Sequence, residues 1–386
     1  MTTGDRDRAG GTKERAAAAR GAATAAPPRR RILAAAALAP VLAGVGAATA
    51  HATDGRDCPP DQDGSDGPDG RDPDRDRDRD PDRDRDHGRG QGRGQGGREL
   101  LRPVPTAASD WSKVATVLGR QGSLLGENIY RTGYPRHDLK VVSHGVKVSA
   151  GLALGSHVAF ARYSDGSSLV MGDLTVTETE MQHAIDALHA HDIMVTAVHK
   201  HLLSHTPDIW WLHVHGHGHD AVALARGMRA AFDRTGTPPG KKPGTPPRID
   251  LDTKAMDTAL GAKGSNAQGI YKSVFRRRET ITDGGLLLPS GTGATTAFNF
   301  QALGGGRAAV NGDFALIADE VHQAMRLLRR GGIDLVELHN HGLADEPRLF
   351  FLHLWAVGDG VRLAKALRRA VDVTNVVPVR ELDPEE

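Results

Sequence analysis

The sequence predicts an α+β protein made of two tandem copies of one unit. We expect mainly antiparallel sheets, helices covering one face, and a pseudo-twofold arrangement of the copies. One observation is that strand-like alternation gives way to helical periodicity in the same order twice along the chain. The other is a repeated histidine pattern, in which each member of the second set lies 140 positions after its counterpart. The pattern comprises His199, His201 and His213, and then His339, His341 and His353.

Shorter matches extend the duplication over most of the chain. They pair Leu118–Gly122 with Leu260–Gly264, Ile129-Tyr130 with Ile270-Tyr271, Ala159-Phe160 with Ala297-Phe298, and Gly172-Asp173 with Gly312-Asp313. The offset drifts between 142 and 138 before it settles at 140. We therefore assign repeat 1 to residues 110–235 and repeat 2 to residues 252–376, with a Pro/Gly-rich linker at 236–251 between them.

Residues 1–52 have the pattern of an export signal. A triple arginine, Arg29–Arg31, precedes an apolar run from residue 32 to residue 50, and Ala50-His51-Ala52 resembles a cleavage site. The paired arginines favour a twin-arginine signal, with general secretory export as the alternative. The run is short and contains Pro40, so we expect no stable membrane span after signal removal.

Residues 53–98 are rich in Asp, Arg, Gly and Pro, and this composition predicts a disordered linker. Cys58, the one cysteine of the chain, lies there, so no intramolecular disulfide can form. The residues before Cys58 do not form a lipobox, which argues against a lipoprotein. We expect an exported protein, extracellular or associated with the cell wall. A net charge of +1 gives no support for nucleic-acid binding.

Within repeat 1, residues 110–118 are predicted to be helical and residues 139–148 to form a hairpin that turns at His144-Gly145. Residues 156–163 and 169–176 are predicted strands. Helical periodicity follows from Met181, and Thr177 with Glu180 has the form of a capping box that opens this helix.

Residues 193–203 and 209–215 are then predicted to form a second hairpin around Pro207-Asp208, and residues 220–232 a final helix. The same order predicts helices at 321–328 and 361–371 in repeat 2. Because the elements are joined by short turns, the strands should pair antiparallel. Whether the two copies form one sheet or two stays open.

The second hairpin predicts how the histidines meet. Alternate residues of a strand share a face, so His199 and His201 should lie together, with His213 opposite one of them on the returning strand. Three imidazoles that leave one coordination position free suit zinc or another divalent metal. A structural histidine cluster and a polar ligand pocket are the alternatives. The run His215, His217 and His219 has no full counterpart in repeat 2, where Trp355 and Val357 stand instead.

Glu180 and Glu320 are the candidate catalytic residues, because each falls on the first turn of the helix before a histidine hairpin. Capping explains Glu180, but Ile317 replaces the capping threonine before Glu320. A fourth metal ligand, an imidazole-orienting group and a general base are the roles considered.

Two other repeated patterns receive ordinary structural interpretations. Gly172-Asp173 and its counterpart Gly312-Asp313 are expected to end strands, where Asp hydrogen-bonds the backbone of a turn. Arg136 with Asp138, and Arg277 with Glu279, are expected to form surface ion pairs of little energetic weight.

The chain also resembles a known bacterial family. The resemblance rests on residues 339–343 and 347–359, which contain His339-Asn340-His341 and His353, and on residues 170–176 with Glu180. These segments resemble the LppY/LpqO family, also described as domain of unknown function 1259, over residues 111–372 in two copies. The resemblance implies an exported protein, often described as a lipoprotein or as peptidoglycan-binding, and no established activity. Lys200 departs from the His-Asn-His form in repeat 1.

Two functions follow as hypotheses. In the first, each repeat binds a divalent metal through its histidine trio, zinc being favoured, and the metal serves a hydrolase. In the second, the protein is a non-catalytic module that binds peptidoglycan or another cell-wall polymer. The sequence does not name a substrate.

Overall fold

The computed structural model describes residues 100–240 and 244–379. The export signal, the linker at 53–98 and Cys58 lie outside the described residues. The α+β prediction is confirmed, since each copy forms its own antiparallel sheet with helices beside it. None of the helices in the described ranges has the length and apolar character needed to cross a membrane.

The sheet of repeat 1 has six strands in the order β1-β2-β5-β6-β9-β7. The strands are β1 (Ser123–Leu125), β2 (Ile129–Pro135), β5 (Gly155–Arg162), β6 (Ser168–Thr177), β7 (Met194–His199) and β9 (Ile209–Gly218).

The sheet of repeat 2 repeats this order as β10-β11-β14-β15-β18-β16 and adds β19 beside β11. The strands are β10 (Ser265–Ala267), β11 (Ile270–Arg277), β14 (Thr295–Gly304), β15 (Arg307–Leu316), β16 (Asp334–His339), β18 (Phe350–Asp359) and β19 (Val376–Pro378).

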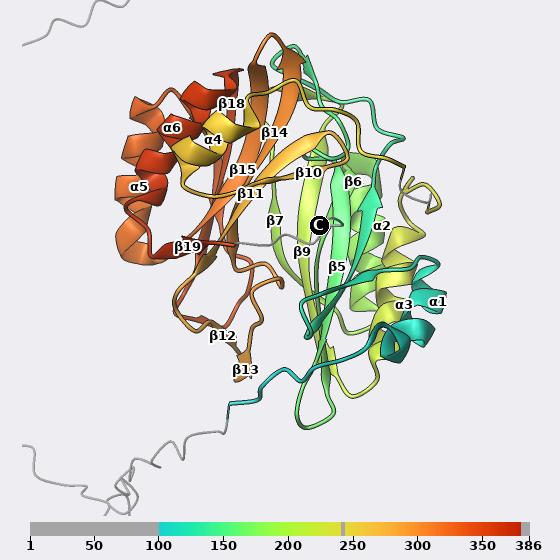
Figure 1. Cartoon of the computed structure of the whole chain (residues 1–386). Helices are drawn as coiled ribbons and strands as arrows, with labels where there is room; N and C mark the ends of the chain where they lie inside the picture. The colour runs from blue at the N-terminus through green and yellow to red at the C-terminus, as the bar shows by residue number, and fades with distance from the viewer. Residues whose placement is uncertain (1–99, 241–243, 380–386) are drawn as a thin grey trace, which may run out of the picture. The chain divides into compact units, whose positions relative to one another are not determined.

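The helices pack on the outer faces of the two sheets, so the two repeats together form layers of helix, sheet, sheet and helix (Figure 1). Repeat 1 has a short 3-10 helix η1 (Ala108–Trp111) with α1 (Ser112–Leu118), α2 (Glu178–His189) and α3 (Ala221–Phe232). Repeat 2 has α4 (Thr253–Leu260), α5 (Ala318–Arg330) and α6 (Gly360–Val371). The predicted capping box is confirmed, because Glu180 N donates to Thr177 Oγ1 and Thr177 N donates to Glu180 Oε2.

Each copy also has a small three-stranded sheet. In repeat 1, β3 (Val142–Ser143) pairs with β4 (Val146–Lys147) and β8 (His205–Thr206). This confirms the predicted turn at His144-Gly145, where both residues have positive φ. In repeat 2 the counterparts are β12 (Thr282–Asp283), β13 (Leu286–Leu287) and β17 (Asp345–Glu346).

Strand alternation explains the two kinds of core. On β9, Leu212 and Val214 belong to the core beneath the helices of repeat 1, whereas Trp211 belongs to a different core that also contains Ile270 and Trp355 of repeat 2. The second core therefore joins the two sheets face to face. The contacts are reciprocal, as expected for a pseudo-twofold relation: Gly151 lies against Ile270, and Gly291 lies against Ile129.

The strand ladders correct one part of the sequence alignment. Phe160 is paired with Val170 on β6, and Phe300 is paired with Val310 on β15. The counterpart of Phe160 is therefore Phe300, not Phe298, and the 140-residue offset already holds in this strand. The wrong match arose because Ala-Phe occurs by chance two residues earlier in repeat 2.

The expected surface ion pairs are instead buried networks. The Arg277 side chain is 1% exposed, and its guanidinium donates to the Ala315 carbonyl and to both carboxylates of Glu279 and Glu320. Arg136 makes the same contacts with Thr175, Asp138 and Glu180. The prediction was wrong because strand periodicity does not show that a helix N-terminus will cover the arginine.

We predict that Arg277→Met lowers the free energy of unfolding by about 3–5 kcal/mol, since it leaves the partly shielded carboxylates without their cation. Arg277→Lys should rescue little, because an ammonium cannot reproduce the planar fork of donors. Chemical denaturation measures both. The matched control is Arg329→Met, whose pair with Asp334 is exposed and should contribute less than about 1 kcal/mol. Equal losses of unfolding free energy in Arg277→Met and Arg329→Met would contradict the claim that the buried network stabilises the fold more than an exposed ion pair does.

The same network predicts a dependence of stability on pH. Burial alone would raise the pKa of Glu279, but hydrogen bonds from Arg277 and Asn375 outweigh it and lower the pKa to about 2. A lowered pKa in the folded state gives stability that is present above the ordinary value near 4.5 and is lost as the pH falls toward 2. Glu279→Gln should therefore flatten the fall of unfolding free energy in this range, and an unchanged slope would contradict the assignment.

Candidate metal centre

The six repeated histidines lie in one cluster between the two sheets. His199 is the last residue of β7 and His339 the last of β16. His213 and His353 lie within β9 and β18, on the faces that meet the other repeat. His201 and His341 lie two residues past the strand ends. The structure thus brings together all six residues that the sequence singled out as ligands.

The predicted hairpin register was wrong. His213 is paired with Ala197, and His199 is paired with Trp211. The chain does not turn tightly after His199, because His205–Thr206 leaves to form β8 in the small sheet. His201 therefore projects from a loop rather than from the strand.

The ring contacts cross between the repeats in reciprocal pairs. The centroids of His201 and His353 are 3.9 Å apart, and those of the equivalent pair His341 and His213 are 3.8 Å apart. His199 stacks on its own counterpart His339 at 4.0 Å. The pseudo-twofold relation therefore passes through the cluster.

Two groups of three histidines have ring nitrogens within 4.8 Å of one another. One is His199, His201 and His353, and the other is His199, His213 and His339. Each group takes residues from both repeats. The sequence predicted that each group would come from a single repeat. The groups cross instead because the two sheets face each other, so the third histidine of each group comes from repeat 2.

Many nitrogens of the cluster have no hydrogen-bond partner although they are shielded from solvent. They are Nδ1 of His199, Nδ1 of His339, Nε2 of His341, and both Nδ1 and Nε2 of His353. His341 Nδ1 must donate to the Gly293 carbonyl at 2.8 Å, because a carbonyl only accepts. The lone pair of His341 is therefore on Nε2, as in a ligand whose other nitrogen is fixed by a second group.

The remaining close contacts join nitrogen to nitrogen. His199 Nε2 lies 2.9 Å from His201 Nε2, and His213 Nε2 lies 3.2 Å from His339 Nε2. Two nitrogens on one tetrahedral zinc are about 3.3 Å apart, given bond lengths of about 2.0–2.1 Å. These spacings are close to those of a shared ion.

The electrostatics favour neutral imidazoles. Burial lowers the pKa of His199, and neighbouring histidines lower it further. Burial likewise lowers the pKa of His201, His213, His341 and His353, and brings the pKa of His339 to about 4. The cluster therefore presents uncharged rings at neutral pH, the form that binds metal.

Asp173 and Asp313 belong to the same site, and the sequence interpretation missed them. They lie in the middle of β6 and β15, opposite His213 and His353, and do not end strands. The glycine before each serves close packing of the backbone: a Cβ on Gly172 would lie 2.6 Å from the His157 carbonyl. The signal that could have revealed the aspartates is their spacing, which is also 140.

Of the two carboxylates, Asp173 is the one that lies beside a histidine side chain, and burial raises the pKa of both. Asp173 Oδ2 lies 3.4 Å from His201 Nε2, while Asp173 Oδ1 accepts no hydrogen bond. Burial, and then the charge of Asp313, raise the pKa of Asp173 well above its ordinary value. Burial raises the pKa of Asp313 to about 7. A cation nearby would stabilise both carboxylates in the charged form.

The structure does not bring Glu180 and Glu320 to the histidines. Glu180 is held by Arg136 and by the backbone of Thr177 and Gly236. Glu320 is held in the same way by Arg277 and by the backbone of Ile317 and Asn375. The catalytic role stays an untested prediction, and these contacts favour a structural role that explains why both glutamates recur.

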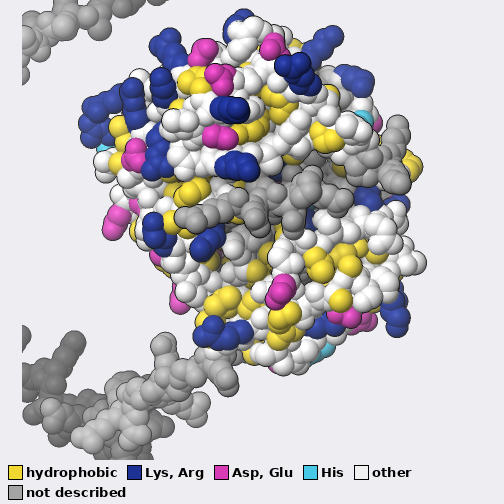
Figure 2. Space-filling model, in the orientation of Figure 1, with side chains coloured by type: hydrophobic (Ala, Val, Ile, Leu, Met, Phe, Trp, Pro, Cys, Tyr) yellow, Lys and Arg dark blue, Asp and Glu magenta, His cyan; other side chains and the backbone are white. Residues whose placement is uncertain are grey.

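The extra histidines of repeat 1 lie at the edge of the site. His215 is buried, and its Nδ1 is 3.0 Å from Asp283 Oδ2, although this oxygen accepts no hydrogen bond of good geometry. His217 and His219 are exposed. Only small histidine patches reach the surface on the face shown in Figure 2, where basic and acidic side chains are interspersed.

Comparison with known proteins adds no activity. No curated protein is significantly similar to the chain. Two solved structures are similar, a trimeric bacterial microcompartment shell protein PduB and EtuB from Clostridium kluyveri, with 13% and 12% sequence identity. Each match covers 67% of this chain and 96% or 95% of the other, with TM-scores of only 0.19 and 0.18.

One family profile matches the chain twice, at residues 112–234 and 254–373. These regions contain every histidine of the cluster and both aspartates. The protein therefore belongs to the family described as Domain of Unknown Function (DUF1259), and it carries two tandem copies of that domain.

Proposed function

We propose that the protein binds a divalent metal ion in the histidine cluster, with His199 as the ligand common to both candidate positions. The observation that carries this proposal is the set of solvent-shielded imidazole nitrogens without partners in the two groups. A buried polar atom without a hydrogen bond costs roughly 1–3 kcal/mol, so several in one place need a compensating ligand. A metal ion would bind the lone-pair nitrogen of each histidine in a group.

The ligand chemistry favours zinc. Neutral imidazoles suit zinc, and three of them leave a fourth position for water, as in catalytic rather than structural zinc sites. An ion in this position would supply a polarised water, and Asp173 beside His201 is placed to orient a ligand or accept a proton. We propose hydrolysis as the reaction class on this basis. We also propose that the protein is exported, as residues 1–52 predict, and is extracellular or associated with the cell wall.

Metal analysis tests the proposal. The purified protein is treated with a chelator, incubated with zinc, freed of excess metal and analysed for its elements. We expect about one zinc or more per chain, and loss of nearly all of it in His199→Ala, because this residue belongs to both groups. His219→Ala, which removes an exposed histidine, is the matched control and should retain the metal. Substoichiometric zinc that His199→Ala leaves unchanged would refute the proposal.

A double-mutant cycle tests whether the ligands cross between repeats. His201 and His353 share one group, so combining His201→Ala with His353→Ala should weaken zinc binding little more than either change alone. His201 and His213 belong to different groups, so the loss of zinc-binding free energy in the double variant should be close to the sum of the losses in the two single variants. Zinc affinity from competition with a chromophoric chelator gives both values. The reverse pattern would indicate that each repeat holds its own ion.

A further inference from the structure

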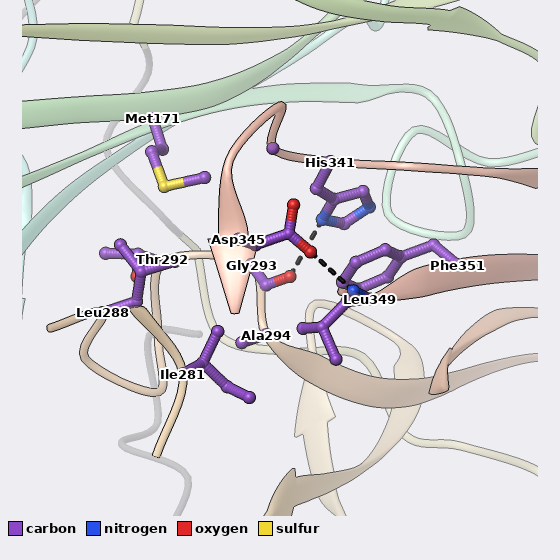
Figure 3. A pocket seen from close by; sticks show the side chains of 11 residues that line it. Met171, Ile281, Leu288, Thr292, Gly293, Ala294, His341, Asp345, Leu349 and Phe351 are labelled. Carbon is purple, nitrogen blue, oxygen red and sulfur yellow. Dashed lines mark hydrogen bonds between the residues drawn. The ribbon is translucent and has the colours of Figure 1, made fainter. Parts of the chain in front are cut away.

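A small cavity adjoins the cluster at His341, and its walls come from both repeats. The space open to the centre of a water-sized molecule is about 10 Å³, which is room for one small molecule. Figure 3 shows His341 and Phe351 on one side and Met171, which comes from β6 of repeat 1, on the other. The apolar part of the wall is formed by Met171, Ile281, Leu288, Ala294, Leu349 and Phe351.

The polar groups of the wall have hydrogen-bond partners, apart from His341 Nε2. His341 Nδ1 is bonded to the Gly293 carbonyl, and the Thr292 hydroxyl donates to the Pro289 carbonyl at 2.7 Å. Asp345 accepts from Arg348 at one oxygen and from the Leu349 backbone at the other. A buried water needs two to four polar partners, so this cavity offers a water little.

Four positions of this wall carry larger residues in repeat 1. Ala153, Leu154, Leu202 and Trp211 stand there and are all buried in the core between the sheets, where repeat 2 has Gly293, Ala294, Gly342 and Phe351. Every one of these residues of repeat 1 is larger than its counterpart. The position of Met171 is taken by Asn311, which donates to the His201 carbonyl at 2.7 Å. These four smaller residues of repeat 2 therefore leave space at the His341 end of the cluster.

We propose that this cavity binds one uncharged, apolar molecule of diatomic size, the class to which dioxygen belongs, beside His341. Small apolar cavities in proteins stay dry and accept such guests. Its position makes the two ends of the pseudo-symmetric cluster unequal, since a small molecule can lie beside His341 but not beside its counterpart His201. The proposal does not require that a metal is bound.

Diffraction from crystals pressurised with krypton tests it, because krypton is close to dioxygen in size and scatters anomalously. We expect one krypton peak among Ala294, Leu349 and Phe351, and none at Leu154, Ile209 and Trp211 in repeat 1. Ala294→Leu introduces the residue of repeat 1 and should abolish the peak. Ala302→Leu, the same change on β14 away from the cavity, is the control and should retain it. Ala294→Val serves the same purpose if the leucine variant does not fold.

Two results would overturn the proposal. One is an ordered water in the cavity, held by several hydrogen bonds and not displaced by krypton. The other is krypton bound equally in both repeats. Because the crystals can be metal-free, failure here leaves the metal proposal standing, and failure of zinc binding leaves this one standing.

Discussion

The structure depends on one constraint: polar imidazoles and carboxylates are buried between two sheets that also share an apolar core. His199 is fully buried, and His213, His353 and Asp173 are nearly so. Desolvation keeps the rings uncharged and disfavours the charged aspartates. The apolar core around Trp211 and Trp355 holds the sheets together and fixes these groups in place. A cation that coordinates the histidine nitrogens and offsets the carboxylate charge would reduce the free-energy cost of burying these groups.

Duplication makes such a site from a single unit. Each copy buries its own core beneath its helices and leaves one sheet face that carries both aromatic and histidine side chains. When two such faces meet about a pseudo-twofold relation, each contact occurs twice, as His201 with His353 and His341 with His213. Neither copy alone contains a complete cluster. The copies differ around the cluster, where some positions carry a small residue in repeat 2 and a larger residue in repeat 1.

Local elements could be predicted from the sequence, but the composition of the site could not. Thr177 with Glu180, and His144-Gly145, are local signals whose geometry depends on adjacent residues, and both predictions are confirmed. The histidines were found because their spacing repeats. The histidines that they contact in the other repeat could not be predicted, because strand periodicity shows on which face of the sheet a residue lies but not what packs against that face. Asp173 was misread for a related reason: Gly-Asp resembles a turn, whereas this glycine allows close approach of neighbouring strands.

The most direct measurement of the central claim is anomalous diffraction at the zinc absorption edge from zinc-loaded crystals. We expect an anomalous peak within coordination distance of His199 and of at least one histidine of repeat 2, either His353 or His339. An ion held by His199, His201 and His213 of repeat 1 alone, or a cluster whose nitrogens are bridged only by ordered water, would contradict it.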